Sequence, residues 1–377
     1  MKKVSYCKKC LFPDTKPDLV FDGDGICDAC RSAERKHGFN EKVDWDVRAN
    51  EFNTLLARIR DIGAPLYDCV IPVSGGKDST WQVYAAKILH KLRTLAVTFD
   101  QFDQTPTGVH NLNILRNIGV DHIHFSLNPL IVKKLVRNGF ETIGDPYWVN
   151  HVGMFSVPFN VAKRFEVPLI IYGENPQFEY GGPEDSRDGM VMDKRWRQEF
   201  GGMRGFREED MIDEADGISA TDLAMLKFPD LEDGTNDLLA VFYGYFFKWD
   251  VAEHLPLIKT LGWKGLDNIP AGSWVDYENC DMQFIDIRER IKYLKYGYGR
   301  ATDQLNIELR GGRIERAEAL SLVTKLDGVV SGKNIQDFCD YLDISESSYN
   351  KIMDSFVNED IFYRTDSGSW VLKNERK

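Results

Sequence analysis

Short apolar runs alternate with amphipathic segments through the middle of the chain. Three runs are continuously apolar and predict strands: residues 69–73, 95–99 and 169–172. Ile123 and Phe125 mark a further strand. Three segments carry apolar side chains at helical spacing instead: residues 79–92, 107–118 and 154–165. Uninterrupted apolar strands that alternate with helices are typical of a parallel sheet covered on both faces, so we expect a doubly wound, mostly parallel α/β sheet.

The segments that flank this pattern have a different character. Residues 31–65 are charged, with apolar side chains at helical spacing, and predict a helix that leads into the sheet. Residues 176–250 are rich in glycine and charged residues and contain few clear strands, so we expect a loop-rich insertion there. Residues 335–377 predict two helices and a β-hairpin that turns at residues 366–368.

Composition and charge narrow the class of protein. The chain has 377 residues and 43% hydrophobic residues, which is typical of a globular protein with two or three structural units. Its net charge is −12. Proteins that bind nucleic acid usually carry more basic than acidic residues, so we expect no nucleic-acid partner. No segment approaches the roughly 20 apolar residues of a membrane span, and no apolar signal core follows the first residues. We therefore expect a cytoplasmic protein without a membrane span.

Four of the seven cysteines lie within the first thirty residues. They form two Cys-x-x-Cys pairs, Cys7 with Cys10 and Cys27 with Cys30. This spacing predicts a four-cysteine zinc site, and residues 19–21 and 22–25 predict the strand and turn that deliver the second pair. Two disulfides or four unrelated thiols are the alternatives, and a reducing cytoplasm disfavours the disulfides. Four thiolates leave no open position for a substrate, so the zinc would be structural.

Residues 74–79 read Ser-Gly-Gly-Lys-Asp-Ser and lie where the first strand ends and a helix begins. Ligands bind at this end of an open α/β sheet. The glycines allow close approach of an anion, the helix N-terminus offers N–H groups and Lys77 adds a positive charge. The segment therefore predicts a pyrophosphate cradle rather than a serine-capped turn. It is not a Walker loop, because Asp78 follows Lys77.

The same hexapeptide resembles the S-G-G-x-D-S signature of the PP-loop ATP pyrophosphatase superfamily. These enzymes cleave ATP between the α and β phosphates and transfer AMP to an oxygen of a substrate. The resemblance implies an adenine nucleotide alpha hydrolase-like fold, with ATP and Mg²⁺ as cofactors. It implies that the loop supplies the catalytic and pyrophosphate-binding residues: Ser74, Gly75, Gly76, Lys77, Asp78 and Ser79. It also implies that the ends of two further strands face the nucleotide: Thr98, Phe99, Asp100, Gly173 and Glu174. For Asp100 and Glu174, a solvated loop carboxylate is the alternative.

Further motifs resemble those of the N-acetyl sugar amidotransferases of bacterial surface-polysaccharide biosynthesis, the WbpG type. The resemblance extends over nearly the whole chain and includes six segments: residues 7–15, 24–30, 74–79, 172–175, 295–303 and 309–314. It implies an enzyme of lipopolysaccharide O-antigen biosynthesis that converts the acetamido group of a nucleotide-linked sugar to an acetamidino group. The implied path is an O-adenylyl imidate attacked by ammonia. The residues that this resemblance suggests for the sugar are Tyr296, Tyr298, Arg300, Asp303 and Arg310, for which helix packing is the alternative.

The chain has no recognisable glutaminase motif. The resemblance therefore implies two separate partners, a glutaminase and an ammonia-channelling, synthase-like subunit. The alternative function is a PP-loop tRNA-thiolating enzyme, which would need Cys280 or Cys339 as a reactive thiol. The scattered cysteines and the acidic charge count against it.

These predictions divide the chain into five units. Residues 1–35 would form the four-cysteine module and residues 36–66 a linking helix. Residues 67–175 would form the PP-loop nucleotide-binding core, and residues 176–255 the loop-rich insertion. Residues 256–377 would form a mainly helical region that meets the substrate or a partner.

Overall fold

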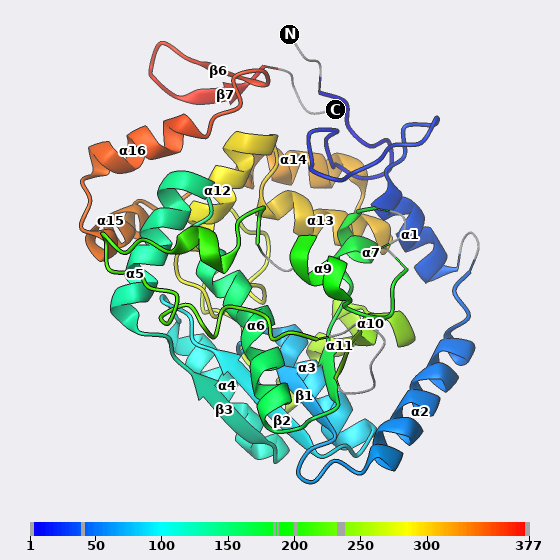
Figure 1. Cartoon of the computed structure of the whole chain (residues 1–377). Helices are drawn as coiled ribbons and strands as arrows, with labels where there is room; N and C mark the ends of the chain where they lie inside the picture. The colour runs from blue at the N-terminus through cyan, green and yellow to red at the C-terminus, as the bar shows by residue number, and fades with distance from the viewer. Residues whose placement is uncertain are drawn as a thin grey trace.

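A central parallel sheet organises the protein. The structure, a computed structural model, describes residues 4–38, 42–183, 186, 188–199, 203–231 and 238–373. Within these residues the sheet has five strands in the order β3-β2-β1-β4-β5 (Figure 1). The strands are β1 (Cys69–Pro72), β2 (Thr94–Phe99), β3 (Asp121–Phe125), β4 (Leu169–Tyr172) and β5 (Leu239–Phe242). All neighbouring pairs are parallel, which confirms the predicted fold class. The order reverses between β1 and β4, and such a switch point is where open α/β sheets bind ligands.

Each face of the sheet has its own hydrophobic core. Side chains alternate between the faces of a strand, so Ile71 and Val70 belong to different cores. The Ile71 face packs against three helices: α2 (Trp45–Ile62), α3 (Lys77–Tyr84) and α4 (Pro106–Ile118). The Val70 face packs against α5 (Pro129–Asn138) and α6 (Trp148–Arg164). Two π-helical turns, Ala85–Leu89 and Gly139–Ile143, extend α3 and α5.

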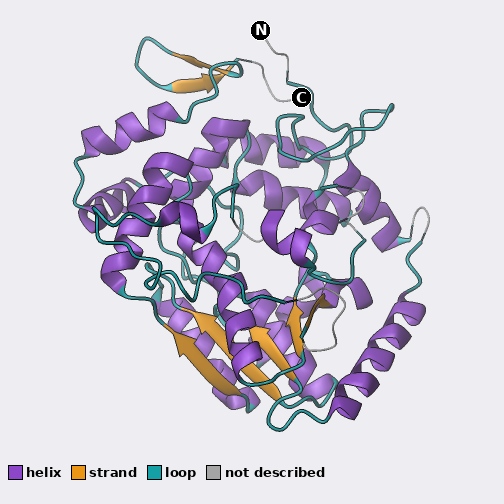
Figure 2. Ribbon diagram, viewed as in Figure 1, coloured by secondary structure: helices purple, strands orange, loops and turns teal. Residues whose placement is uncertain are grey.

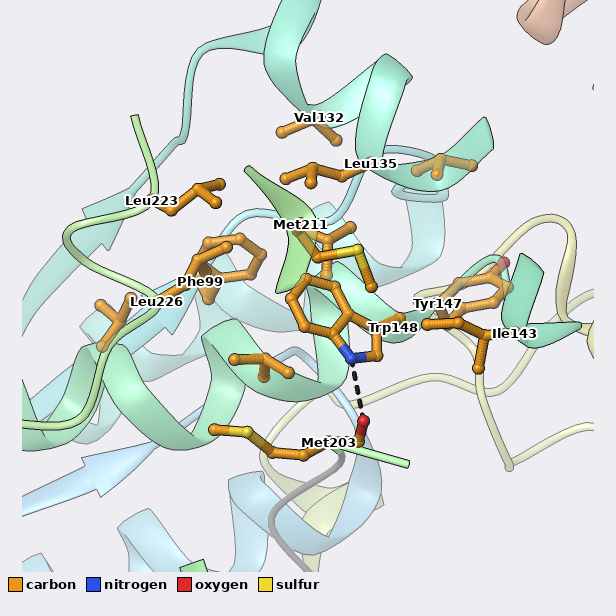
Figure 3. Packing of buried hydrophobic residues seen from close by; sticks show 14 of the residues in the cluster. Phe99, Val132, Leu135, Ile143, Tyr147, Trp148, Met203, Met211, Leu223 and Leu226 are labelled. Atoms are coloured by element: carbon orange, nitrogen blue, oxygen red, sulfur yellow. Dashed lines mark hydrogen bonds between the residues drawn. The ribbon is translucent and has the colours of Figure 1, made fainter. Parts of the chain in front are cut away.

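Trp148 lies at the centre of the second core (Figure 3). Its ring is fully buried, and its Nε1 donates a hydrogen bond to the carbonyl oxygen of Met203 at 3.0 Å. Met203, Met211 and Leu223 come from the expected loop-rich insertion and pack in this core (Figure 3). The insertion is therefore anchored on the sheet by apolar side chains.

The structure defines the segments around the core more closely. The expected insertion supplies one strand, β5, which is formed by the apolar run at 239–242 and pairs with β4. It also contains short helices: α7 (Pro176–Tyr180), α9 (Lys194–Glu199), the 3₁₀ turn Glu208–Met211, α10 (Tyr243–Phe246) and the start of α11 (Val251–Thr260). The single linking helix is instead two, α1 (Asp28–His37) and α2. Gly38 ends α1 with a left-handed φ of 82°, and the side chain of Asp44 caps α2.

The C-terminal region is mainly helical, as predicted. Its elements are α12 (Ile285–Tyr296), α13 (Arg300–Arg310), α14 (Arg316–Leu326), α15 (Gly332–Leu342), α16 (Glu346–Ser355), β6 (Phe362–Arg364) and β7 (Trp370–Leu372). The last four confirm the two helices and the hairpin. The strand arrows point toward the layer that holds α12 to α14, so this region covers the carboxyl edge of the sheet (Figure 2). Among the described residues, no helix combines the length and apolar character needed to cross a membrane.

Candidate nucleotide and metal sites

The four N-terminal cysteines form one buried cluster. Their sulfur atoms all lie within 4.8 Å of one another. Sγ of Cys7 is 3.9 Å from Sγ of Cys30, and Sγ of Cys10 is 3.6 Å from Sγ of Cys27. A tetrahedral ion with metal–sulfur bonds of about 2.3 Å separates its sulfurs by roughly 3.8 Å, so the cluster fits zinc. The expected strand at 19–21 is reduced to a single bridge between Phe21 and Cys27.

The cysteine cluster is packed against the C-terminal region. The ring of Phe12, two residues after the first pair, meets the ring of Tyr298 edge-on with centroids 5.6 Å apart. The guanidinium of Arg310 lies 5.1 Å from the centroid of the same Phe12 ring. One N–H of Arg310 donates to the carbonyl oxygen of Glu179 at 2.6 Å. These contacts join the cysteine module, α13 and α7.

The Ser74–Ser79 loop connects the end of β1 to the start of α3. The backbone N–H of Gly76 donates to Oγ of Ser74 at 3.4 Å, and Oγ of Ser79 donates to the carbonyl oxygen of Gly76 at 3.1 Å. Gly75 has a φ of +93°, and a Cβ there would lie 2.5 Å from the carbonyl oxygen of Gly108. Only glycine fits this position, so the loop can keep its open backbone against the first turn of α4.

Residues 278–284 run across the loop from the C-terminal region. The carboxylate of Asp281 accepts from Nε2 of Gln101 at 2.5 Å. Burial raises the pKa of Asp281, an effect that the nearby Ser74 hydroxyl partly offsets. The backbone of Asp281 can approach α4 closely because residue 108 is glycine. A Cβ at residue 108 would lie 2.8 Å from the Cα of Asp281.

Lys77, the cation of the loop, is held between two carboxylates. Its ammonium contacts Asp78 at 2.6 Å and Glu278 at 3.5 Å, and its side chain is 12% exposed. Burial alone would lower the pKa of Lys77, but Asp78 and Glu278 outweigh it and raise the pKa. Glu278 also pairs with Arg300. No sequence spacing indicated Glu278 or Asp281, because they lie about two hundred residues after the loop.

A cavity opens beside the loop at the switch point between β1 and β4. Its walls come from α1, the loop, the segment after β4, α7, the segment before α11, the Glu278 segment and α13. Lys77, Asp78, Glu174, Glu278 and Arg310 all line it. The cysteine module, the sheet and the C-terminal region thus share one cavity.

The C-terminal part of the chain is similar to a described family. Residues 272–377 match the family "LPS biosynthesis protein WbpG-like, C-terminal domain". We refer to these residues, which are similar to that family domain, as the WbpG-like domain. The WbpG-like domain therefore supplies Glu278 and Asp281 to the loop.

Other known proteins are more distant. NMN synthetase from Francisella tularensis is similar in structure, with 14% sequence identity and a TM-score of 0.35 over 72% of this chain and 94% of that chain. A likeness this distant carries no argument. No curated protein matches the chain.

The residues expected at the second strand lie away from the cavity. The side chain of Thr98 is fully buried in the sheet, where its Oγ1 donates to the carbonyl oxygen of Val73 at 2.9 Å. Phe99 belongs to the core around Trp148 (Figure 3). The carboxylate of Asp100 contacts Nε2 of His124 at 3.1 Å. In contrast, Glu174 lines the cavity.

The five residues suggested for the sugar are also divided. Tyr298 and Tyr296 pack against the cysteine module, and Asp303 pairs with Lys292 at 2.6 Å. Arg300, at the start of α13 in the WbpG-like domain, reaches the loop only through Glu278. Arg310 alone of the five is among the described residues that line the cavity.

Proposed function

We propose that the chain is an ATP-dependent amidotransferase of lipopolysaccharide biosynthesis. It would convert the acetamido group of a nucleotide-linked sugar to an acetamidino group, with release of AMP and pyrophosphate. The observation that carries this proposal is the contact between Lys77 of the PP-loop-like segment and Glu278 of the WbpG-like domain. A loop suited to ATP and a domain typical of lipopolysaccharide biosynthesis line the same cavity.

The residues of the loop suit a triphosphate. Gly75, Gly76 and the first turn of α3 would offer backbone N–H groups to the pyrophosphate, and the Ser74 and Ser79 hydroxyls would add donors. Asp78 would face the Mg²⁺ that accompanies ATP. ATP supplies the AMP that turns the amide oxygen into a leaving group. The residues around it would hold the amide oxygen in line with the α phosphate and neutralise the charge that develops there.

Zinc in the cysteine cluster would have a structural role. Four sulfurs complete its coordination, and the cluster holds α1 and α13 at the cavity wall. The cluster would stabilise a module too small to form a large core of its own.

The ammonia source is part of the same proposal. A separate glutaminase and an ammonia-channelling, synthase-like subunit would supply ammonia to the cavity. High ammonium would then replace both subunits in an assay, which makes the chain testable alone.

The test is a pyrophosphate-release assay with ATP, Mg²⁺, ammonium and a panel of UDP- and CMP-linked acetamido sugars. We expect sugar-dependent AMP and pyrophosphate, and a product about one mass unit lighter than the sugar because NH replaces oxygen. Asp78→Ala should abolish turnover, and its melting curve should show a folded protein with a lowered melting temperature, because the buried ammonium of Lys77 loses the carboxylate 2.6 Å away. Wild-type amidine formation by Asp78→Ala would show that the assigned site is wrong.

No observation favours tRNA thiolation. Cys280 is fully buried, its Sγ contacts the carbonyl oxygen of Asp276 at 3.4 Å, and burial raises its pKa to about 12. Cys339 is also buried, and burial raises its pKa. Reactive cysteines have the opposite character, with a lowered pKa and an accessible sulfur. Pyrophosphate release on addition of tRNA, without turnover of any sugar, would nevertheless favour this alternative.

A further inference from the structure

Five carboxylates line the cavity beside the loop, and their partners differ. Four of them contact a cation: Asp78 contacts Lys77 at 2.6 Å, Glu179 contacts Lys36 at 2.7 Å, Asp250 contacts Arg313 at 3.2 Å and Glu278 contacts Lys77 at 3.5 Å. The fifth is Glu174. The described residues provide no cation within ion-pair distance of its carboxylate, and Lys77 acts on it only at longer range. Glu174 is thus the cavity carboxylate with a free capacity to accept a proton.

The backbone of Glu174 is held firmly at the switch point. Glu174 is the second residue after β4, and the N–H of Gly244, after β5, donates to the carbonyl oxygen of the intervening Gly173 at 3.0 Å. A Cβ at residue 244 would lie 3.2 Å from Cα of Glu174, so the two strand ends are in close contact. Asn175 then caps α7 by accepting from the N–H of Gln177 at 3.0 Å. A side chain placed by a strand end and a helix cap is well suited to a fixed chemical role.

We propose that Glu174 is the general base that takes a proton from ammonia during amidine formation. This inference rests on the proposed function and assigns Glu174 to the second chemical step rather than to nucleotide binding. The lone pair of ammonia attacks the imidate carbon and forms the new C–N bond. One of the three ammonia protons passes to the Glu174 carboxylate. The C–O bond to AMP breaks, and AMP leaves with the electron pair. The neutral amidine keeps the two remaining protons of that nitrogen.

The electrostatic surroundings of Glu174 suit this role. Burial and the neighbouring Asp78 raise the pKa of Glu174 to about 7, against the opposing effect of Lys77. A base works best when its pKa is near the working pH, because it is then both ionised and able to hold a proton. The titratable groups that share the cavity with it are Lys36, His37, Lys77, Asp78, Glu179, Tyr180, Asp250, Glu278, Arg310 and Arg313. Among these groups, burial and Lys36 lower the pKa of His37, whereas the negative charge of Asp250 acts to raise it.

The experiment separates the two steps of the reaction. The substrate is the UDP- or CMP-linked acetamido sugar that the wild-type chain converts fastest. Step one is followed without ammonia, as sugar-dependent exchange of labelled pyrophosphate into ATP. Step two is followed as amidine formation with ammonium. The variants are Glu174→Gln, which keeps the shape but cannot accept a proton, and Glu174→Asp. The matched control is Glu253→Gln, on the exposed side of α11, where the side chain is 59% exposed.

We expect Glu174→Gln to retain the exchange reaction within about threefold and to lose amidine formation by about 100-fold or more. Glu174→Asp should recover part of this loss, and Glu253→Gln should behave as the wild type. The wild-type kcat/KM, calculated for unprotonated ammonia, should rise with pH and level off above about 7, as Glu174 becomes ionised. The kcat/KM of Glu174→Gln should not show this rise. Melting curves check that each variant is folded.

Three results would count against the inference, and they are distinguishable. Amidine formation by folded Glu174→Gln at the wild-type rate would overturn the role of Glu174 and leave the proposed function intact. Equal loss of exchange and of amidine formation would assign Glu174 to nucleotide binding instead. Absence of both reactions in the wild type with every sugar would overturn the proposed function itself.

Discussion

Replacing Glu278 by glutamine should destabilise the protein strongly, although the change is small in volume. Glu278 is 7% exposed and lies between Lys77 and Arg300. Its carboxylate also accepts from Nε2 of Gln304 at 3.2 Å. Glutamine removes the negative charge, while Arg300 stays buried with its Nε already without a partner. Removing one member of a buried ion pair typically costs about 3–5 kcal/mol, because the other charge remains desolvated.

The pKa of Glu278 gives a second measure of the same effect. Burial alone would raise it, but Arg300 and Lys77 outweigh burial and lower it from 4.5 to about 2. That difference corresponds to about 3 kcal/mol of preference for the ionised form. Because the pKa is lowered in the folded state, this stabilisation is present above the unfolded pKa of about 4.5 and is lost as the pH falls toward 2.

Urea unfolding of the wild type and of Glu278→Gln measures the loss. At pH 7 we expect Glu278→Gln to lower the free energy of unfolding by about 3 kcal/mol. The control Glu253→Gln, which removes an exposed ion pair with Lys248, should lower it by less than about 0.5 kcal/mol. The difference between wild type and Glu278→Gln should shrink as the pH falls below about 4.5. Equal urea midpoints at pH 7, with equal slopes, would refute the argument that Glu278 stabilises this buried cluster.

Two further substitutions test the metal cluster and the close approach at the loop. Cys10→Ser should lower the zinc content from about one ion per chain to near zero and reduce the melting temperature, whereas Cys339→Ser should keep its zinc; metal analysis of the purified variants decides this. Gly108→Ala should lower the free energy of unfolding by about 1–3 kcal/mol, because the new Cβ would lie 2.8 Å from Cα of Asp281. Gly332→Ala, where a Cβ meets nothing within 4 Å, is its control. A more stable Gly108→Ala variant, as helix propensity alone predicts, would contradict the close approach.

The sheet was predictable because its signals are local. Three of the four predicted strands, β1, β2 and β4, are runs of mostly buried residues, and β4 has the predicted bounds, 169–172. The cysteine cluster was predictable for the same reason, since two residues between thiolates bring both sulfurs to one point. The hairpin at 362–372 follows from its turn residues.

What the sequence did not reveal depends on long-range contacts. The apolar run of β5 is as continuous as that of β4, but it lies in a segment rich in glycine and charged residues, and its pairing with β4, about seventy residues earlier, has no local signal. The aromatic and charged residues at 296–303 indicated a binding surface, yet Tyr298 packs on Phe12 and Asp303 on Lys292. A residue type suited to sugar binding is equally suited to an interface between two units, and only the tertiary structure separates the two roles.

The arrangement of the cavity makes the position of Lys77 depend on both the WbpG-like domain and the sheet. Lys77 lies in the first turn of α3, where a helix N-terminus already favours anions. Glu278 from the WbpG-like domain and Asp78 hold its ammonium in the buried cavity, so the position of the lysine depends on both units. An incoming triphosphate would compete with these carboxylates for the lysine. The affinity of the loop for ATP should therefore depend on how the WbpG-like domain is seated, and through Arg310 and Phe12 on the cysteine cluster as well.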